Sequence, residues 1–154
     1  MLPLTRTAAS KKNPKLTSLD AFVGTWKTEG THPMVPGKTF HGRTTFDWIE
    51  GGAFFVMRSQ IDEEEIPSGI AIFGTDDGTG ACTMLYFDER DVSRHYEVTF
   101  AHNGMSWSRN DPDLSQLVTM TLSADGQTIT AVGQMSQKGG PWKGDLSLTY
   151  SRAD

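Results

Sequence analysis

The sequence from Gly24 to Arg152 is a series of short strand-like segments, and this pattern limits the fold more than any other feature. Thr, Val, Ile, Phe, Trp and Tyr alternate with polar residues, and Gly, Asp or Asn interrupt them at intervals of roughly 8 to 12 residues. About ten strands are predicted, at positions 24–30, 38–49, 52–61, 67–74, 80–88, 93–100, 104–109, 115–123, 126–135 and 141–151.

Several breaks between these segments are typical of tight β-hairpins, because Asn-Gly and Asp-Gly readily adopt the positive φ angles that such turns need. They are Glu50-Gly51-Gly52, Asp76-Asp77-Gly78, His102-Asn103-Gly104 and Ala124-Asp125-Gly126. Successive hairpins produce a meander, and a long meander removes its exposed edges most simply by closing on itself. The predicted fold is therefore all-β: a single antiparallel up-and-down barrel of about ten strands.

The N-terminal region differs from the rest of the chain. Residues 1–15 contain Pro, Lys, Ser and Asn with little apolar surface, so a flexible N-terminal arm is predicted there. Leu16 to Val23 is predicted to form a short helical turn with Thr17 or Ser18 as its N-cap. The barrel domain is accordingly assigned to residues 16–154.

Composition limits the classes of function. The 154 residues are enough for one domain with one core, and 14 basic against 19 acidic residues give a net charge of −5. No basic stripe is present that would bind nucleic acid or an anionic membrane. Cys82 is the single cysteine, which excludes an internal disulfide, and no apolar run reaches signal-peptide or membrane-helix length. A soluble cytoplasmic protein is expected.

Two predicted strands, 52–61 and 67–74, are apolar on both faces. Phe54 and Val56 alternate with Phe55 and Met57, and the segment 70–73 is apolar throughout. One face must lie outside the barrel and needs a cover, either the N-terminal arm or a second subunit. The sequence does not decide which of the two sets faces outward. A homodimer through this surface is predicted.

The opening segment Phe22-Val23-Gly24-Thr25-Trp26-Lys27, together with the ending Tyr150-Ser151-Arg152, resembles the calycins, the barrels of lipocalins and fatty-acid-binding proteins. The resemblance implies that Trp26 closes one end of the barrel and that Arg152 covers its ring in a cation–π contact. Residues 28–38 are too short for the helical lid of fatty-acid-binding proteins. Closer similarity, from about residue 16 onward, is to a bacterial family of uncharacterised lipocalin-like domains. The segments that carry it are Thr31-His32-Pro33, His41-Gly42-Arg43-Thr44-Thr45-Phe46-Asp47-Trp48, Glu50-Gly51-Gly52 and Tyr86-Phe87-Asp88.

The segment Gly24-Thr25-Trp26-Lys27-Thr28-Glu29-Gly30 also resembles the start of the nitrobindins, ten-stranded barrels that bind haem through a histidine in a late strand. This chain has no histidine after His102, so the position of that ligand has no counterpart. Haem binding is therefore kept only as a minor alternative, and no cofactor is expected. No pair of His, Cys, Asp or Glu has metal-ligand spacing, so no metal site is expected either.

Six residues are candidates for lining a ligand site in the barrel lumen: Arg58, Tyr86, Tyr96, Trp107, His41 and His95. Tyr86, Tyr96 and Trp107 are aromatic residues of middle strands, which line either a core or a pocket. Arg58 shares a strand face with Phe54 and Val56. In calycin barrels such an arginine commonly anchors a ligand carboxylate, but it would equally suit an outer face, paired with an acid. His41 and His95 are strand residues that face either the lumen or solvent.

Non-catalytic binding of a small, largely apolar ligand, with or without a carboxylate, is the predicted function. No nucleophile elbow, phosphate-binding glycine loop or dinucleotide fingerprint is present. An enzyme that cyclises or isomerises a metabolite with acid–base residues of the lumen is the alternative. Any such pair must come from different strands, since strand neighbours such as His95, Tyr96 and Glu97 point to opposite faces in turn.

Overall fold

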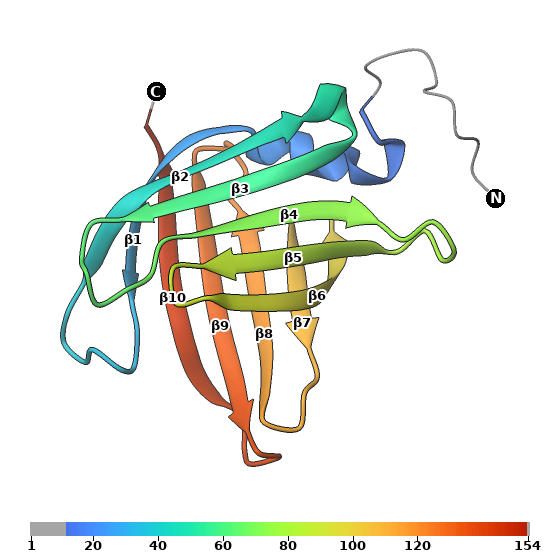
Figure 1. Cartoon of the computed structure of the whole chain (residues 1–154). Coiled ribbons are helices and arrows are strands. Elements are labelled where there is room, and N and C mark those ends of the chain that lie inside the picture. Colours follow the sequence, from blue (N-terminus) through green and yellow to red (C-terminus); the bar gives the residue numbers. More distant parts are fainter. Residues whose placement is uncertain (1–11, 154) are drawn as a thin grey trace.

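The computed structural model describes residues 12–153 and contains one closed barrel of antiparallel strands. Around the barrel the order is β1-β10-β9-β8-β7-β6-β5-β4-β3-β2, so each strand pairs with its neighbours in the chain and β10 closes the ring on β1 (Figure 1). The strands are β1 (Gly24–Thr31), β2 (Phe40–Ile49), β3 (Phe54–Ile61), β4 (Gly69–Thr75), β5 (Cys82–Asp88), β6 (Val92–Ala101), β7 (Gly104–Arg109), β8 (Leu114–Leu122), β9 (Thr128–Gln137) and β10 (Lys143–Arg152). This confirms the predicted fold class.

The turn residues place the strand ends close to where the sequence predicts them. Ala101 pairs directly with Gly104, which leaves His102 and Asn103 as a two-residue hairpin. Gly126 adopts a φ of 71°, a conformation that favours glycine over other residues. A three-residue 3₁₀ turn, η2 (Glu50–Gly52), connects β2 to β3.

A 3₁₀ helix, η1 (Pro14–Phe22), covers one end of the barrel. It begins earlier than predicted: Asn13, not Thr17 or Ser18, is the N-cap, and its side chain accepts a hydrogen bond from Lys15 N at 3.0 Å. Pro14 follows at the first helical position, where its fixed φ and missing N–H suit a helix start. The apolar residues of η1, Leu16, Leu19 and Phe22, are all buried. Of the predicted arm, residues 1–11 lie outside the described residues.

Trp26 and Arg152 close this end as the calycin resemblance implies. They are directly paired across β1 and β10, and the guanidinium carbon lies 4.1 Å from the centre of the indole ring. The indole Nε1 donates to Phe22 O at 2.9 Å, and Arg152 donates to Val23 O at 2.7 Å. Gly24 makes room for this contact, since a Cβ there would lie 2.6 Å from Arg152 Nη1.

The half of the interior next to η1 is filled with side chains. Phe46, Phe55, Phe73 and Trp107 follow one another with ring centres 6.1 to 6.5 Å apart. Around them the buried residues include Trp26, Met84, Met105, Met120, Ile129 and Tyr150. This half is a packed core in the ordinary sense.

Strand register decides which faces of β3 and β4 point outward. Phe55 pairs with Phe73 and Met57 with Ala71, and all four are buried inside. Phe54 and Val56 therefore face outward. The structure thus decides which of the two apolar sets lies outside, which the sequence alone did not. Within residues 12–153 no helix is long and apolar enough to cross a membrane.

Candidate functional site

The interior is polar at the end of the barrel opposite η1, and we call this region the polar half. It contains inward-facing side chains of β5, β6, β8 and β10, with one residue of the loop 32–39. They are Tyr86, Asp88, Arg94, Tyr96, Gln116, Asp145 and His32. The loops 32–39, 62–68, 89–91, 110–113 and 138–142 surround this end.

Gln116 connects four of these side chains. Its Oε1 accepts a hydrogen bond from the Tyr96 hydroxyl at 2.7 Å and one from Arg94 Nη1 at 3.3 Å. Its Nε2 donates to Asp145 Oδ2 at 3.3 Å, and the other Asp145 oxygen lies 3.2 Å from His32 Nε2. Tyr96 and Gln116 belong to strands separated by β7, so these contacts cross the interior of the barrel.

A β-bulge brings Asp145 into this network. Simple alternation along β10 places Asp145 outside, on the face opposite Tyr150. The register shifts between Gly144 and Ser147, and the extra residue turns Asp145 toward the interior. Gly133 on β9 faces the bulge, and a Cβ at this position would lie 2.9 Å from Leu146 O. The bulge therefore depends on this glycine.

Tyr86, Asp88 and Arg90 form a second group at the same end. The Tyr86 hydroxyl donates to Asp88 Oδ2 at 2.7 Å, while Arg90 Nε and Nη2 donate to the two carboxylate oxygens at 3.1 and 2.7 Å. The Asp88 side chain is fully covered. Its burial alone would raise the carboxyl pKa, but the hydrogen bonds from Arg90 and Tyr86 outweigh burial and lower the pKa.

The two groups meet through their tyrosines. The rings of Tyr86 and Tyr96 lie 6.4 Å apart in an edge-to-face arrangement. Burial raises the pKa of both phenols, and in Tyr86 the Asp88 carboxylate adds to this effect. Both hydroxyls therefore stay protonated as hydrogen-bond donors.

Arg94 is the cation of the polar half that has no anionic partner within residues 12–153. Its side chain is half-buried and faces inward opposite Tyr86, and its side-chain contacts are with the neutral groups of Gln116 and Tyr96. Arg90 and Arg109, by contrast, pair with Asp88 and Asp111. A partly buried guanidinium without a counter-ion favours the binding of an anion.

The six predicted lining residues divide into two sets. Tyr86 and Tyr96 face the polar half, and Trp107 faces inward in the packed half. The other three, Arg58, His41 and His95, are exposed on the outer face, so their predicted place in the lumen is wrong. Arg58 does share a face with Phe54 and Val56, as the sequence indicates, but that face points outward because its neighbours Phe55 and Met57 pair into the core.

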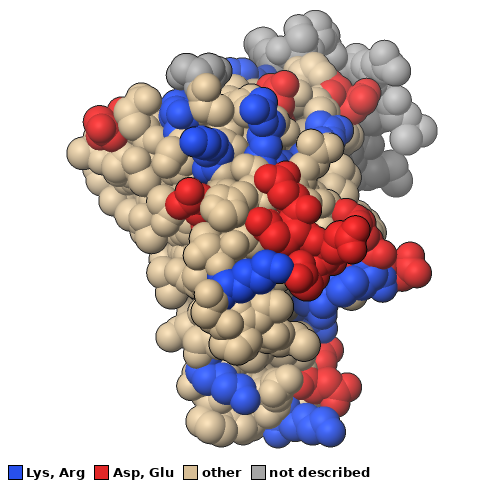
Figure 2. Space-filling view, turned by 90° about the vertical axis from the view of Figure 1, so that its left-hand side faces the viewer, with Lys and Arg blue, Asp and Glu red and all other residues tan. Residues whose placement is uncertain are grey.

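The two outward histidines differ in their surroundings. His41 Nδ1 lies 3.1 Å from Glu63 Oε1, and the backbone N–H of His41 donates to the same carboxylate at 2.7 Å. Glu63 belongs to the acidic tip 62–65, and Figure 2 shows Asp and Glu side chains gathered in a band on the face that it displays. His95 lies opposite Leu85 on the outer face.

Five residues of the polar half were missed by sequence reasoning: Asp88, Arg94, Gln116, Asp145 and His32. Arg94 had a usable signal, because it lies two residues before Tyr96 and therefore on the same strand face. For Gln116 the sequence offers no signal beyond the alternation of β8. The bulge hides Asp145, and His32 looks like an exposed turn residue.

Neither a metal nor a reactive thiol is indicated in the described part of the chain. No three His, Cys, Asp or Glu side chains of residues 12–153 come together in a way that could hold a metal ion. Burial raises the pKa of the Cys82 thiol to about 11, which opposes formation of a reactive thiolate.

The architecture defines the class: a closed antiparallel barrel of ten strands that fits a calycin-like barrel at the coarse level. The solved structure of Rv2717c from M. tuberculosis has the same fold, with a TM-score of 0.69 over 94% of this chain and 100% of that chain at 13% sequence identity. No family model matches the sequence, and no curated protein matches it. The likeness at this identity supports the fold alone.

Proposed function

We propose that this protein binds a small organic acid in the polar half of the barrel, with the acidic group on Arg94. The unpaired, half-buried Arg94 is the observation that carries the proposal. A carboxylate accepts two parallel hydrogen bonds from a guanidinium, and the Tyr96 hydroxyl and the Gln116 amide lie beside it as further polar contacts.

The rest of the ligand is small and partly apolar. The η1 half is filled by its own side chains, so the ligand cannot extend far toward Trp26. The rings of Tyr86 and Tyr96 offer apolar surface next to Arg94. An aromatic or short-chain carboxylic acid matches this combination better than a long fatty acid.

Binding is better supported than catalysis, because His32 and Asp88, two of the acid–base groups of the polar half, are already engaged by their neighbours. His32 Nδ1 accepts a hydrogen bond from Met34 N at 3.1 Å, so the proton of the neutral ring lies on Nε2 and is donated to Asp145. The Asp88 carboxylate accepts from both Tyr86 and Arg90. An isomerase or cyclase needs a base with a free lone pair.

The proposal is tested by isothermal titration with benzoate-type acids, medium-chain fatty acids and their neutral amides. Arg94→Gln removes the charge and keeps polarity, and Arg58→Gln is the matched control on the outer face. We expect acids to bind and Arg94→Gln to weaken them roughly 10- to 100-fold, as for the loss of a hydrogen bond to a charged group. Equal binding of acids and amides, or equal binding by the two variants, would contradict the proposal.

The haem alternative has a direct test. His32 contacts Asp145, His41 contacts Glu63, and His95 and His102 are exposed. Purified protein mixed with hemin is expected to show no shifted Soret band. A stable shifted band that disappears in a histidine variant would replace the organic acid with haem as the ligand.

A further inference from the structure

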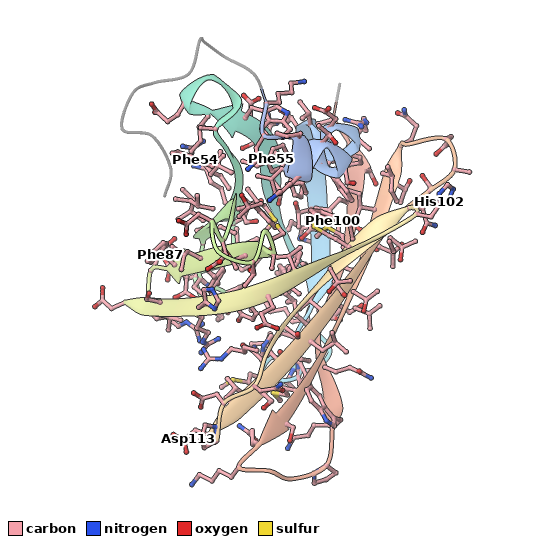
Figure 3. All side chains as sticks on the ribbon, turned by 90° about the vertical axis from the view of Figure 1, so that its right-hand side faces the viewer. Phe54, Phe55, Phe87, Phe100, His102 and Asp113 are labelled. Carbon is pink, nitrogen blue, oxygen red and sulfur yellow. The ribbon has the colours of Figure 1, made fainter. Side chains whose placement is uncertain are left out.

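An apolar surface covers the outer face of β3, β4 and β5, and we call it the β3–β5 face. By strand register it consists of Phe54, Ile70, Ile72, Leu85 and Phe87, while Val56, which points the same way, is only 1% exposed and lies beneath them. Phe54, Leu85 and Phe87 are 38%, 45% and 38% exposed, although they are large apolar residues. Figure 3 shows Phe54 and Phe87 on the same side of the barrel, with Phe55 nearer its centre.

Strand register arranges this face in rows. Val56, Ile72 and Leu85 are paired across the three strands, and the next row consists of Arg58, Ile70 and Phe87. A shallow hollow of about 430 Å³ adjoins the second row, and Arg58, Ile70, Phe87 and Glu89 are among the residues that line it. The surface is therefore continuous and apolar, with a long cation and an acid at one corner.

We propose that two copies of this chain associate through the β3–β5 face around a two-fold axis that runs along β4. Such an axis places β3 of one copy over β5 of its partner, and the reverse. In the first row Ile72 then meets its own counterpart, and the exposed Leu85 of each copy lies over the position of the covered Val56 of the other. This match buries the exposed apolar side chains against one another.

Charge complementarity supports a second copy as the occupant. With the same axis, Arg58 of one copy lies over Phe87 and next to Glu89 of the other, inside the hollow. Within residues 12–153 Arg58 has no ion-pair partner of its own chain. Asp47 pairs with Val56 on β2 and His95 pairs with Leu85 on β6, so these two side chains also come opposite each other. Every contact occurs twice by symmetry.

The area of the β3–β5 face determines how tightly the two copies are expected to associate. The 7 residues of β4 extend over roughly 23 Å, and three strands with half of each neighbour cover roughly 20 Å, which gives on the order of 500 Å² per copy. A standard stable interface buries about 800 Å² per partner. The dimer is therefore weak, with a dissociation constant in the micromolar range, and its population depends on concentration.

Sedimentation velocity of the full chain over about 1 to 300 µM tests the proposal. We expect the wild type to shift from monomer to dimer over this range, and Leu85→Glu and Arg58→Glu each to weaken association at least tenfold. Val132→Glu, at a 51% exposed apolar position on β9, is the matched control and should leave association unchanged. The double variant Arg58→Glu with Glu89→Arg restores the proposed pair in reverse and should recover the dimer.

Thermal unfolding of each variant shows whether the barrel remains folded. A monomer throughout the concentration range would overturn the proposal. So would a dimer that Leu85→Glu and Val132→Glu affect equally, or a charge-reversed double variant that associates no better than Arg58→Glu.

Discussion

Arg152 lies over the Trp26 ring while its guanidinium donates hydrogen bonds to three backbone carbonyls in two separate segments of the chain. Nη1 and Nη2 donate to Val23 O and Ala21 O at 2.7 and 2.9 Å, and Nε donates to Gly126 O at 2.9 Å. One side chain of β10 thereby joins the end of η1, the β8–β9 turn and the first strand.

We predict that Arg152→Met lowers the free energy of unfolding by about 2–4 kcal/mol. The variant loses a cation–π contact of about 0.5–2 kcal/mol and leaves carbonyls near a helix end without donors. Arg43→Met, at an exposed position of β2, should change stability by less than about 0.5 kcal/mol. Urea titration followed by tryptophan fluorescence measures both, and equal effects would contradict the assigned role.

The bulge of β10 can be tested at the residue that faces it. Gly133→Ala places a Cβ 2.9 Å from Leu146 O, so we expect a loss of about 1–3 kcal/mol of stability and weaker binding of acids. Gly144→Ala meets nothing within 4 Å and should be close to neutral. If both variants unfold at the same urea concentration, Gly133 is not required by the bulge.

Asp88 makes stability depend on pH. Its folded-state pKa is lowered, so the carboxylate stabilises the protein above its unfolded pKa of about 3.9, and this contribution is lost as the pH falls through the folded pKa. We expect Asp88→Asn to be less stable than the wild type by about 1–3 kcal/mol at pH 7. The difference should shrink steadily below pH 4. Urea unfolding at pH 7, 4 and 3 measures it, and a constant difference would exclude ionisation as its cause.

His32 fixes the loop 32–39 to the wall of the barrel through Asp145, and within the loop its Nδ1 accepts a hydrogen bond from Met34 N. We expect His32→Ala to accelerate amide exchange of Met34 and Val35 by about tenfold without a large change in global stability. His102→Ala, in the turn at the other end, should not affect these amides. Hydrogen–deuterium exchange with mass spectrometry provides the measurement, and unchanged exchange in the loop would show that another contact holds it.

Most of the fold could be predicted because it depends on local signals. Hairpin residues and alternation placed every strand end within two residues of the structure, for example 52 against Phe54 and 135 against Gln137. The contact between Trp26 and Arg152 was implied by the resemblance to the calycins and not by a local signal, and the structure contains it.

The candidate site was predicted only in part, because side chains alternate between the two faces of a strand and the sequence does not always show which face lies inside. Tyr96 lies in a strand with one clear inner face, and it does face inward. Tyr86 also faces inward, although Leu85 and Phe87 make the outer face of its strand apolar as well. Arg58 lies in a strand whose two faces are both apolar, so alternation gave no direction. Asp145 escaped prediction because a single extra residue in β10 reverses its side, and no local signal marks that bulge.

Both described ends of the chain lie at the η1 end of the barrel: Lys12 contacts Asp20 within η1, and Ala153 N donates to Thr25 O at the start of β1 (Figure 1). A tether attached beyond residue 153 would therefore hold the molecule by its packed end and leave the polar half directed away from the support. With the proposed site in the polar half, protein immobilised at this end should capture an organic acid as well as free protein does, and this outcome can be measured at a surface.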